Sequence, residues 1–159
     1  MTTAQDIIET LGLQPLEGEG GFFRQTWIKE SANGAPIGTA ILYLITPESF
    51  SALHRLDADE VFHFYLGDPC EQIVITPDND LHLETLGSNI LAGEQVQSIV
   101  PAGCWQGTKL VEGGSWALVG TTMAPGFHTE GFELATLADI RTMPLEISGI
   151  ATSYLADGA

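Results

Sequence analysis

Basic residues are scarce in this 159-residue sequence. It has five Lys and Arg residues against 21 Asp and Glu residues, which gives a formal net charge of -16 at pH 7. A protein with this charge repels the phosphate groups of nucleic acids and of anionic lipids. We therefore expect neither a nucleic acid nor a membrane as a partner.

Cysteines and long hydrophobic runs are also few. The two cysteines, Cys70 and Cys104, are too few for a disulfide framework, which fits a reducing cytoplasm. The longest apolar run, AILYLI, is too short to cross a bilayer. The N-terminus, MTTAQDIIET, has neither the basic start nor the apolar stretch of a secretory signal. The sequence therefore predicts a cytoplasmic protein.

Length and composition are typical of a single globular domain. Hydrophobic residues make up 44% of the chain and charged residues 16%, which is typical of neither a disordered nor a fibrous protein. A chain of this length can bury a full core. We expect one domain over residues 1–159, with its core at about 8–144. The extension over 145–159 is predicted to be an added strand or a loosely held end.

Helical patterns occur only near the two ends of the chain. Thr3, followed three residues later by Asp6, predicts a helix over 4–12, and LATLADIRTM predicts another over 136–143. Between them, Gly and Pro separate short strand-like runs. These runs are FFRQTWI, TAILYLIT, EVFHFYL, QIVIT, LHLETL, VQSIV and WALVGTTM. Many short strands without intervening helices favour a mainly β closed barrel or sandwich.

The stretch LHRLDADEVFHFYLGD, residues 53–68, holds two of the four histidines. It resembles the first cupin motif, in which a His is followed by a second His, a Glu and a Gly. His54 and Glu60 match two of these positions, whereas Leu56 stands where the second His is expected. PAGCWQ resembles the second cupin motif, with Gln106 in place of a His ligand.

More specifically, the chain resembles an uncharacterised branch known as the fifth cupin grouping, from about residue 8 to 140. Matching signatures occur in order: EGGFFRQT, TAILYLI, HR…DEVFHFYLGDP, VPAGCWQG and APGF…FELA. The chain departs from that branch at Glu17-Gly18, where His-Pro is usual, and at His128, where an acid is usual. The resemblance implies a double-stranded β-helix (a cupin or jelly-roll barrel) with an interior pocket, and a homodimer. It implies no known reaction.

The resemblance raises the question of a metal. A cupin metal site uses three His and one Glu, which suit Fe, Mn, Ni or Zn. Here only His54 and Glu60 are good ligands, because leucine cannot coordinate and a neutral amide is a poor ligand for these metals. His63 could add a ligand only if a bulge turned it to the face of Glu60. We therefore expect no cofactor; the alternative is a degenerate metal site of His54, Glu60 and His63.

The pocket is expected to hold a small polar ligand, sugar-like or anionic. The candidate catalytic residues are His54, Glu60 and Tyr65, which could act as acids and bases. We expect His54 to titrate near neutral pH, with Glu60 within hydrogen-bonding reach to orient it. The candidate ligand-binding residues are Arg24, His63, Trp105, Gln106 and His128.

Two of these candidates have an equally strong structural interpretation. Arg24 could grip a carboxylate or phosphate, or could form an ion pair with a nearby acid. Trp105 could be a flat wall against a ring or sugar face, or could belong to the hydrophobic core.

Three functions follow from this pocket. The first is a metal-independent sugar or sugar-acid epimerase or isomerase, by analogy with nucleotide-sugar epimerases that share the barrel. The second is a non-catalytic protein that binds a small molecule. The third, a metal-dependent dioxygenase or isomerase, requires His63 or His128 to supply a missing ligand. Loss of His54 would reduce the rate in an enzyme and the affinity in a binding protein.

Overall fold

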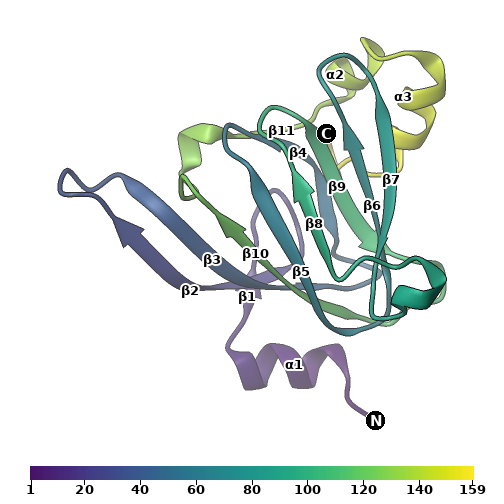
Figure 1. The fold of residues 1–159 in the computed structure, drawn as a ribbon. Helices are drawn as coiled ribbons and strands as arrows, with labels where there is room; N and C mark the ends of the chain where they lie inside the picture. The colour runs from purple at the N-terminus through teal and green to yellow at the C-terminus, as the bar shows by residue number, and fades with distance from the viewer.

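The computed structural model describes residues 1–159 and consists mainly of two antiparallel β-sheets that face each other (Figure 1). One sheet has six strands in the order β1-β2-β3-β10-β5-β8, and the other has five in the order β11-β4-β9-β6-β7. The mainly β jelly-roll fold predicted from the sequence is therefore confirmed. No helix is long and apolar enough to span a bilayer.

The elements follow the chain with short connections. The strands are β1 Gln14–Pro15, β2 Phe22–Glu30, β3 Pro36–Ile45, β4 Ser51–Leu56, β5 Glu60–Gly67, β6 Cys70–Ile75, β7 Leu81–Leu86, β8 Gln97–Val100, β9 Trp105–Leu110, β10 Ala117–Met123 and β11 Phe132–Leu134. The helices are α1 Ala4–Leu11, the 3-10 turns η1 Ile90–Ala92 and η2 Thr129–Gly131, α2 Leu137–Arg141 and α3 Leu145–Thr152.

The two expected helices are present, and each begins with a capping box. The Thr3 hydroxyl accepts a hydrogen bond from the Asp6 backbone N–H, and the Asp6 carboxylate accepts one from the Thr3 N–H, which begins α1. Gly12, with φ of 62°, ends it in the left-handed conformation. The second capping box, at Thr136 and Asp139, begins α2 in the same way.

The C-terminal extension is neither an added strand nor a loosely held end, so that expectation is wrong. It forms α3, whose Ile147 and Ala151 are buried together with Tyr154, just after the helix, in a hydrophobic cluster with residues of β4, β6, β9 and α2. Tyr154 is fully buried, and its hydroxyl donates to Glu71 Oε1 at 2.6 Å. Apolar burial on the outer face of the five-stranded sheet therefore holds the chain end in place.

Strands β4 and β9 lie outside the runs that predict strands. Their sequences, SALHRL and WQGTKL, lack the β-branched and aromatic runs typical of strands. The two strands pair with each other, with His54 opposite Gln106. Several of their inward side chains are polar, because these strands face a polar part of the barrel interior. The polar residues interrupt the apolar alternation that is typical of a strand.

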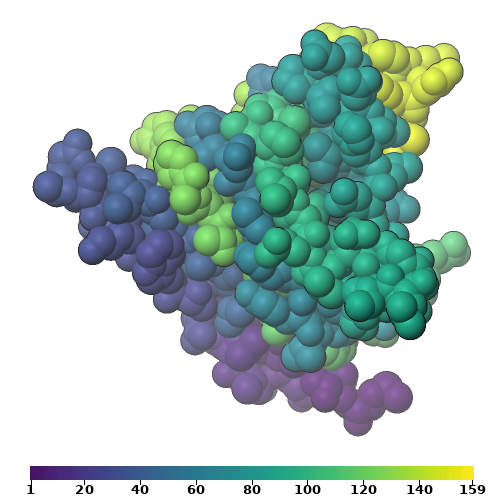
Figure 2. Space-filling model, viewed as in Figure 1, coloured from purple at the N-terminus to yellow at the C-terminus, as the bar shows by residue number.

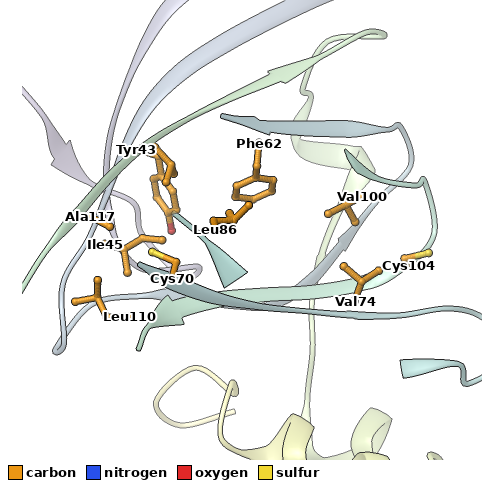
Figure 3. Packing of buried hydrophobic residues seen from close by; sticks show 11 residues of the cluster. Tyr43, Ile45, Phe62, Cys70, Val74, Leu86, Val100, Cys104, Leu110 and Ala117 are labelled. Atoms are coloured by element: carbon orange, nitrogen blue, oxygen red, sulfur yellow. The ribbon is translucent and has the colours of Figure 1, made fainter. Parts of the chain in front are cut away.

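The hydrophobic part of the barrel interior is a cluster of 11 buried residues between the two sheets (Figure 3). Both cysteines belong to it and are free thiols. Burial raises the pKa of Cys70 to about 12 and also raises the pKa of Cys104, so neither is a reactive thiolate at neutral pH. The cluster fills part of the barrel and leaves space for a cavity beside it.

Candidate functional site

A cavity of about 230 Å³ lies inside the barrel, lined by side chains from both sheets and from two loops. Strands β2, β3, β4, β5, β10 and β11 contribute to it, together with the loop before β2 and the loop before η2. Its lining residues are Leu16, Glu17, Glu19, Phe23, Gln25, Thr39, Ile41, Leu56, Glu60, Thr121, Met123, Phe127, Thr129 and Phe132. The lining thus combines aromatic walls with carboxylates and hydroxyls.

His54 points inward from β4 and is only 1% exposed. Its Nδ1 lies 2.7 Å from the Ala52 carbonyl oxygen, and its Nε2 lies 2.9 Å from Glu19 Oε1. Its ring stacks on Phe132, with 5.3 Å between centroids. A carbonyl oxygen can only accept a hydrogen bond, and so can an ionised carboxylate. Both ring nitrogens therefore carry protons, and His54 is an imidazolium.

The charge on His54 has a definite cause. Burial opposes the charged form, but the Glu19 carboxylate outweighs this penalty, and the pKa of His54 rises to about 9. The expectation that His54 titrates near neutral pH is therefore wrong. Since neither ring nitrogen has a free lone pair, His54 is poorly suited to be a catalytic base.

Glu19 is the functional residue that sequence reasoning missed. It lies in the glycine-rich loop before β2, where its own carbonyl oxygen accepts a hydrogen bond from Ala52 N–H at 2.9 Å. The next two residues, Gly20 and Gly21, have positive φ values, and a Cβ on Gly21 would lie 2.6 Å from the ring of Tyr43. Glycine thus lets the loop approach the barrel closely. The acid that opens the motif EGGFFRQT was the available signal.

Glu60 begins β5, lines the cavity, is 7% exposed and forms no ion pair. It is not the hydrogen-bond partner of His54, because Glu19 holds that position. Burial raises the pKa of Glu60 to about 7, while the charge of His54 opposes this rise. Glu60 can therefore exist in either protonation state near neutral pH.

Gln106 lies on β9, directly opposite His54, and is 1% exposed. Its amide faces the carboxyl of Glu60, but it lies behind the residues that line the cavity. Its Oε1 has no hydrogen-bond partner. A hydrogen bond from Gln106 lowers the pKa of Glu60, so Gln106 supports the ionised form of Glu60 without lining the cavity.

Tyr65 and His63 lie on the outer face of the barrel, so neither belongs to the cavity. Strand alternation places Glu60 inward and His63 outward, and the only register shift between β5 and β10 lies beyond His63. His63 Nε2 lies 3.2 Å from the Thr122 hydroxyl, and its ring stacks on Tyr65, which is 48% exposed.

Arg24 and Trp105 also point away from the cavity. Arg24 is exposed on β2, while its neighbours Phe23 and Gln25 line the cavity. Trp105 belongs to the cluster beneath the C-terminal helices, and the guanidinium of Arg55 lies 4.5 Å from the centre of its ring. Trp105 is therefore a core residue. Arg24 places no positive charge inside the barrel that could bind an anionic ligand.

His128 lies beside the cavity without lining it, since its neighbours Phe127 and Thr129 supply the lining. Its Nε2 lies 2.9 Å from Asp57 Oδ2, and its Nδ1 lies 3.4 Å from Glu130 Oε2. Hydrogen bonds to these two carboxylates raise the pKa of His128. The residue joins two surface loops next to the cavity.

The residues present do not fit a cupin metal centre. Of the four expected ligand positions, only His54 and Glu60 have suitable side chains, and both ring nitrogens of His54 are already hydrogen-bonded. His63 lies on the opposite face of its strand. No group of three or more His, Cys, Asp or Glu side chains is arranged to hold a metal ion.

Comparison with known proteins agrees with this architecture. A protein from Shewanella oneidensis has 30% sequence identity and a TM-score of 0.90, covering 98% of this chain and 99% of that one. A hypothetical protein from Leishmania major has 27% identity and a TM-score of 0.86, covering 98% and 100%. No curated protein matches the chain.

More distant structures share the fold alone. Oxalate decarboxylase from Bacillus subtilis has 14% identity and a TM-score of 0.59, covering 91% of this chain and 35% of that one. The family model described as Cupin superfamily (DUF985) matches residues 5–135, which is most of the chain. The chain therefore belongs to this family of the cupin superfamily.

Proposed function

We propose that the cavity binds a small sugar-like metabolite and that Glu60 moves a proton on it, as in a metal-independent epimerase or isomerase. The observation that carries this proposal is a buried carboxyl group without an ion-pair partner, with a pKa of about 7, at the wall of the cavity. Perturbed titratable groups in a cavity are typical of catalytic sites.

The size and lining of the cavity support a small, partly polar ligand. Drug-sized ligands occupy pockets of roughly 300–1,000 Å³, and the volume here is about 230 Å³. Aromatic side chains can stack on the apolar face of a sugar ring, while hydroxyls and carboxylates meet its polar edge. Phe23 and Phe132 supply such rings here, and Thr39, Thr121 and Glu60 supply such polar groups.

In this proposal, Glu60 is the only group in the cavity that exchanges a proton. Its carboxylate takes a proton from the carbon next to a carbonyl group; the C–H electron pair moves into the resulting enolate, and the proton is then returned to carbon or oxygen. The positive charge of His54, held by Glu19, lies near enough to influence Glu60 and favours negative charge in the cavity. His54 and Glu19 are thus positioning residues.

A non-catalytic binding function is the second candidate, and one observation favours it. An epimerase commonly uses two groups that exchange protons, but both ring nitrogens of His54 are occupied and Tyr65 lies outside. A cavity with a single such group would still bind a metabolite.

The test is solvent deuterium incorporation. Aldoses, ketoses and sugar acids are incubated with the protein in D₂O, and loss of the proton next to the carbonyl group is followed by ¹H NMR. We expect exchange with the wild-type protein and a loss of at least about a hundredfold with Glu60→Gln, which is the typical contribution of a general base.

Binding of the same compounds is measured by calorimetry. Glu60→Gln should retain most of the affinity, because it keeps the size of the side chain. Binding without exchange in the wild-type protein would support the non-catalytic function, and absence of binding by every compound would reject both.

A further inference from the structure

We propose that the ligand of this cavity carries a positively charged amino group, which Glu17 meets at the cavity entrance. The inference rests on the proposed function and specifies its substrate class as an amino derivative of a sugar-like metabolite. It replaces the expectation of an anionic ligand, because Arg24, on which that expectation depended, lies on the outer face.

The charged side chains that line the cavity are all carboxylates. Three carboxylates line it, from Glu17, Glu19 and Glu60, and no Lys or Arg side chain does. The Glu19 carboxylate is paired with the His54 imidazolium at 2.9 Å, which leaves Glu17 and Glu60 without an ion-pair partner. The five basic residues of the chain lie elsewhere: Arg24, Lys29, Arg55, Lys109 and Arg141.

A carboxylate or phosphate on the ligand would meet two unpaired acids inside a partly enclosed cavity. An ammonium group would instead supply the missing positive charge, and it would make the ionised form of Glu60 easier to reach. Ligand binding would then convert Glu60 into the base that the proposed reaction needs. The same charge distribution that disfavours an acidic substrate thus favours an amine.

The position of Glu17 allows its carboxylate to contact the ammonium group of the ligand. Glu17 is exposed, and it lines both the interior cavity and a surface groove of about 320 Å³. The glycine-rich loop separates this groove from the cavity. Glu60 lies at the buried end and remains free for proton transfer. The faces of Phe23, Phe127 and Phe132, which line the same cavity, offer further attraction for a cation. The net charge of -16 attracts cations toward the molecule.

The test compares closely related sugars of positive, zero and negative charge. Glucosamine, glucose and glucuronate, together with the matching galactose set, are titrated calorimetrically in low salt at about pH 6.5, below the pKa of such amines. We expect the amino sugar to bind up to about fivefold more tightly than the neutral sugar, which is the upper end of the range for one exposed ion pair. The uronate should bind more weakly than both.

Matched variants assign the effect to Glu17. Glu17→Gln should remove the advantage of the amino sugar over the neutral sugar. Glu84→Gln makes the same change of charge at an exposed position on β7, which does not line the cavity, and should leave the preference intact.

The two proposals fail in different ways. Equal or tighter binding of the neutral sugar or the uronate would overturn the amine preference and leave the proposed function standing. An amine preference that survives Glu17→Gln would also overturn this inference, whereas absence of binding by every member of both sets would overturn both.

Discussion

At the scale of single residues, the function of His54 depends on its partner. Cupin motif positions made His54 and Glu60 a candidate pair, but the structure pairs His54 with Glu19 and leaves Glu60 facing the cavity. The ion pair between His54 and Glu19 therefore gives His54 and Glu60 different roles. His54 becomes a fixed positive charge, and Glu60 becomes the group that can gain or lose a proton near neutral pH.

This pairing predicts how stability changes with pH. Folded His54 keeps its proton up to about pH 9, whereas an unpaired His loses it near 6.5. Its contribution to stability is therefore complete below about pH 6.5 and is lost as the pH rises through 9. We expect the free energy of unfolding to fall by on the order of 3 kcal/mol over this interval, measured by urea denaturation at each pH.

Two variants distinguish the titration of His54 from that of Glu60. Glu19→Gln removes the partner of His54 and should flatten the fall between pH 6.5 and 9, even though it lowers stability overall. Glu60→Gln should keep most of that fall, because Glu60 raises the pKa of His54 less than Glu19 does. It should also remove a fall between about pH 4.5 and 7, because burial keeps folded Glu60 protonated over that range. An unchanged slope in Glu19→Gln would contradict the assigned ion pair.

At the scale of elements, the C-terminal helix is a structural part of the barrel. Tyr154, two residues after this helix ends, is fully buried and donates a hydrogen bond to Glu71. The Lys109 ammonium lies 4.2 Å from the centre of its ring. A Cβ on Gly107 would lie only 2.7 Å from the same ring, so glycine on β9 makes room for it. Tyr154 thus anchors the end of α3 against the five-stranded sheet.

Replacing this side chain should therefore be costly. Tyr154→Ala is expected to lower the free energy of unfolding by roughly 3–5 kcal/mol, as for other large buried aromatics. Leu145→Ala, at the start of α3 where the side chain is 88% exposed, should change it by less than about 0.5 kcal/mol. Chemical denaturation followed by circular dichroism checks both, and similar effects of the two substitutions would show that α3 is not packed as described.

At the scale of the whole molecule, the run TAILYLI is the first candidate for the contact surface of the proposed homodimer, because it is too apolar to be exposed, but the structure requires a different surface. TAILYLI is not an edge, because β3 lies between β2 and β10. Strand β2 pairs with β1 only at Phe22 and Phe23, so its remaining residues form an open edge in a hairpin that projects from the body (Figures 1 and 2). Trp27 is 49% exposed there. Open edges with apolar side chains favour pairing with another chain.

We expect sedimentation at micromolar concentration to show a dimer. Trp27→Glu should shift it toward monomer, because it places a charge in the proposed contact. Leu83→Glu, on the edge strand β7 of the other sheet and 55% exposed in the wild type, should not. A monomeric wild-type protein would reject the dimer, and dissociation by Leu83→Glu alone would move the interface to β7.

The sequence by itself determined the fold class, the first two helices and the strands with a regular apolar pattern. These features depend on local signals: the capping box at Thr3, turn residues, and runs of β-branched and aromatic side chains. Resemblance to the first cupin motif placed Glu60 in the pocket, and Glu60 is buried there. The local signals could not reveal β4 and β9, whose inward polar residues interrupt the pattern.

Only the tertiary structure decided which residues share the cavity. The sheet pairing turns Arg24, His63, Tyr65 and Trp105 away from it, and the distant glycine-rich loop brings Glu19 onto His54. The pattern of a strand shows that neighbouring side chains point to opposite faces. It does not show which face the barrel encloses, or which charged side chain from another segment comes to lie beside it. Burial and charge partners set the protonation of His54 and Glu60, and both arise only when separate segments pack together.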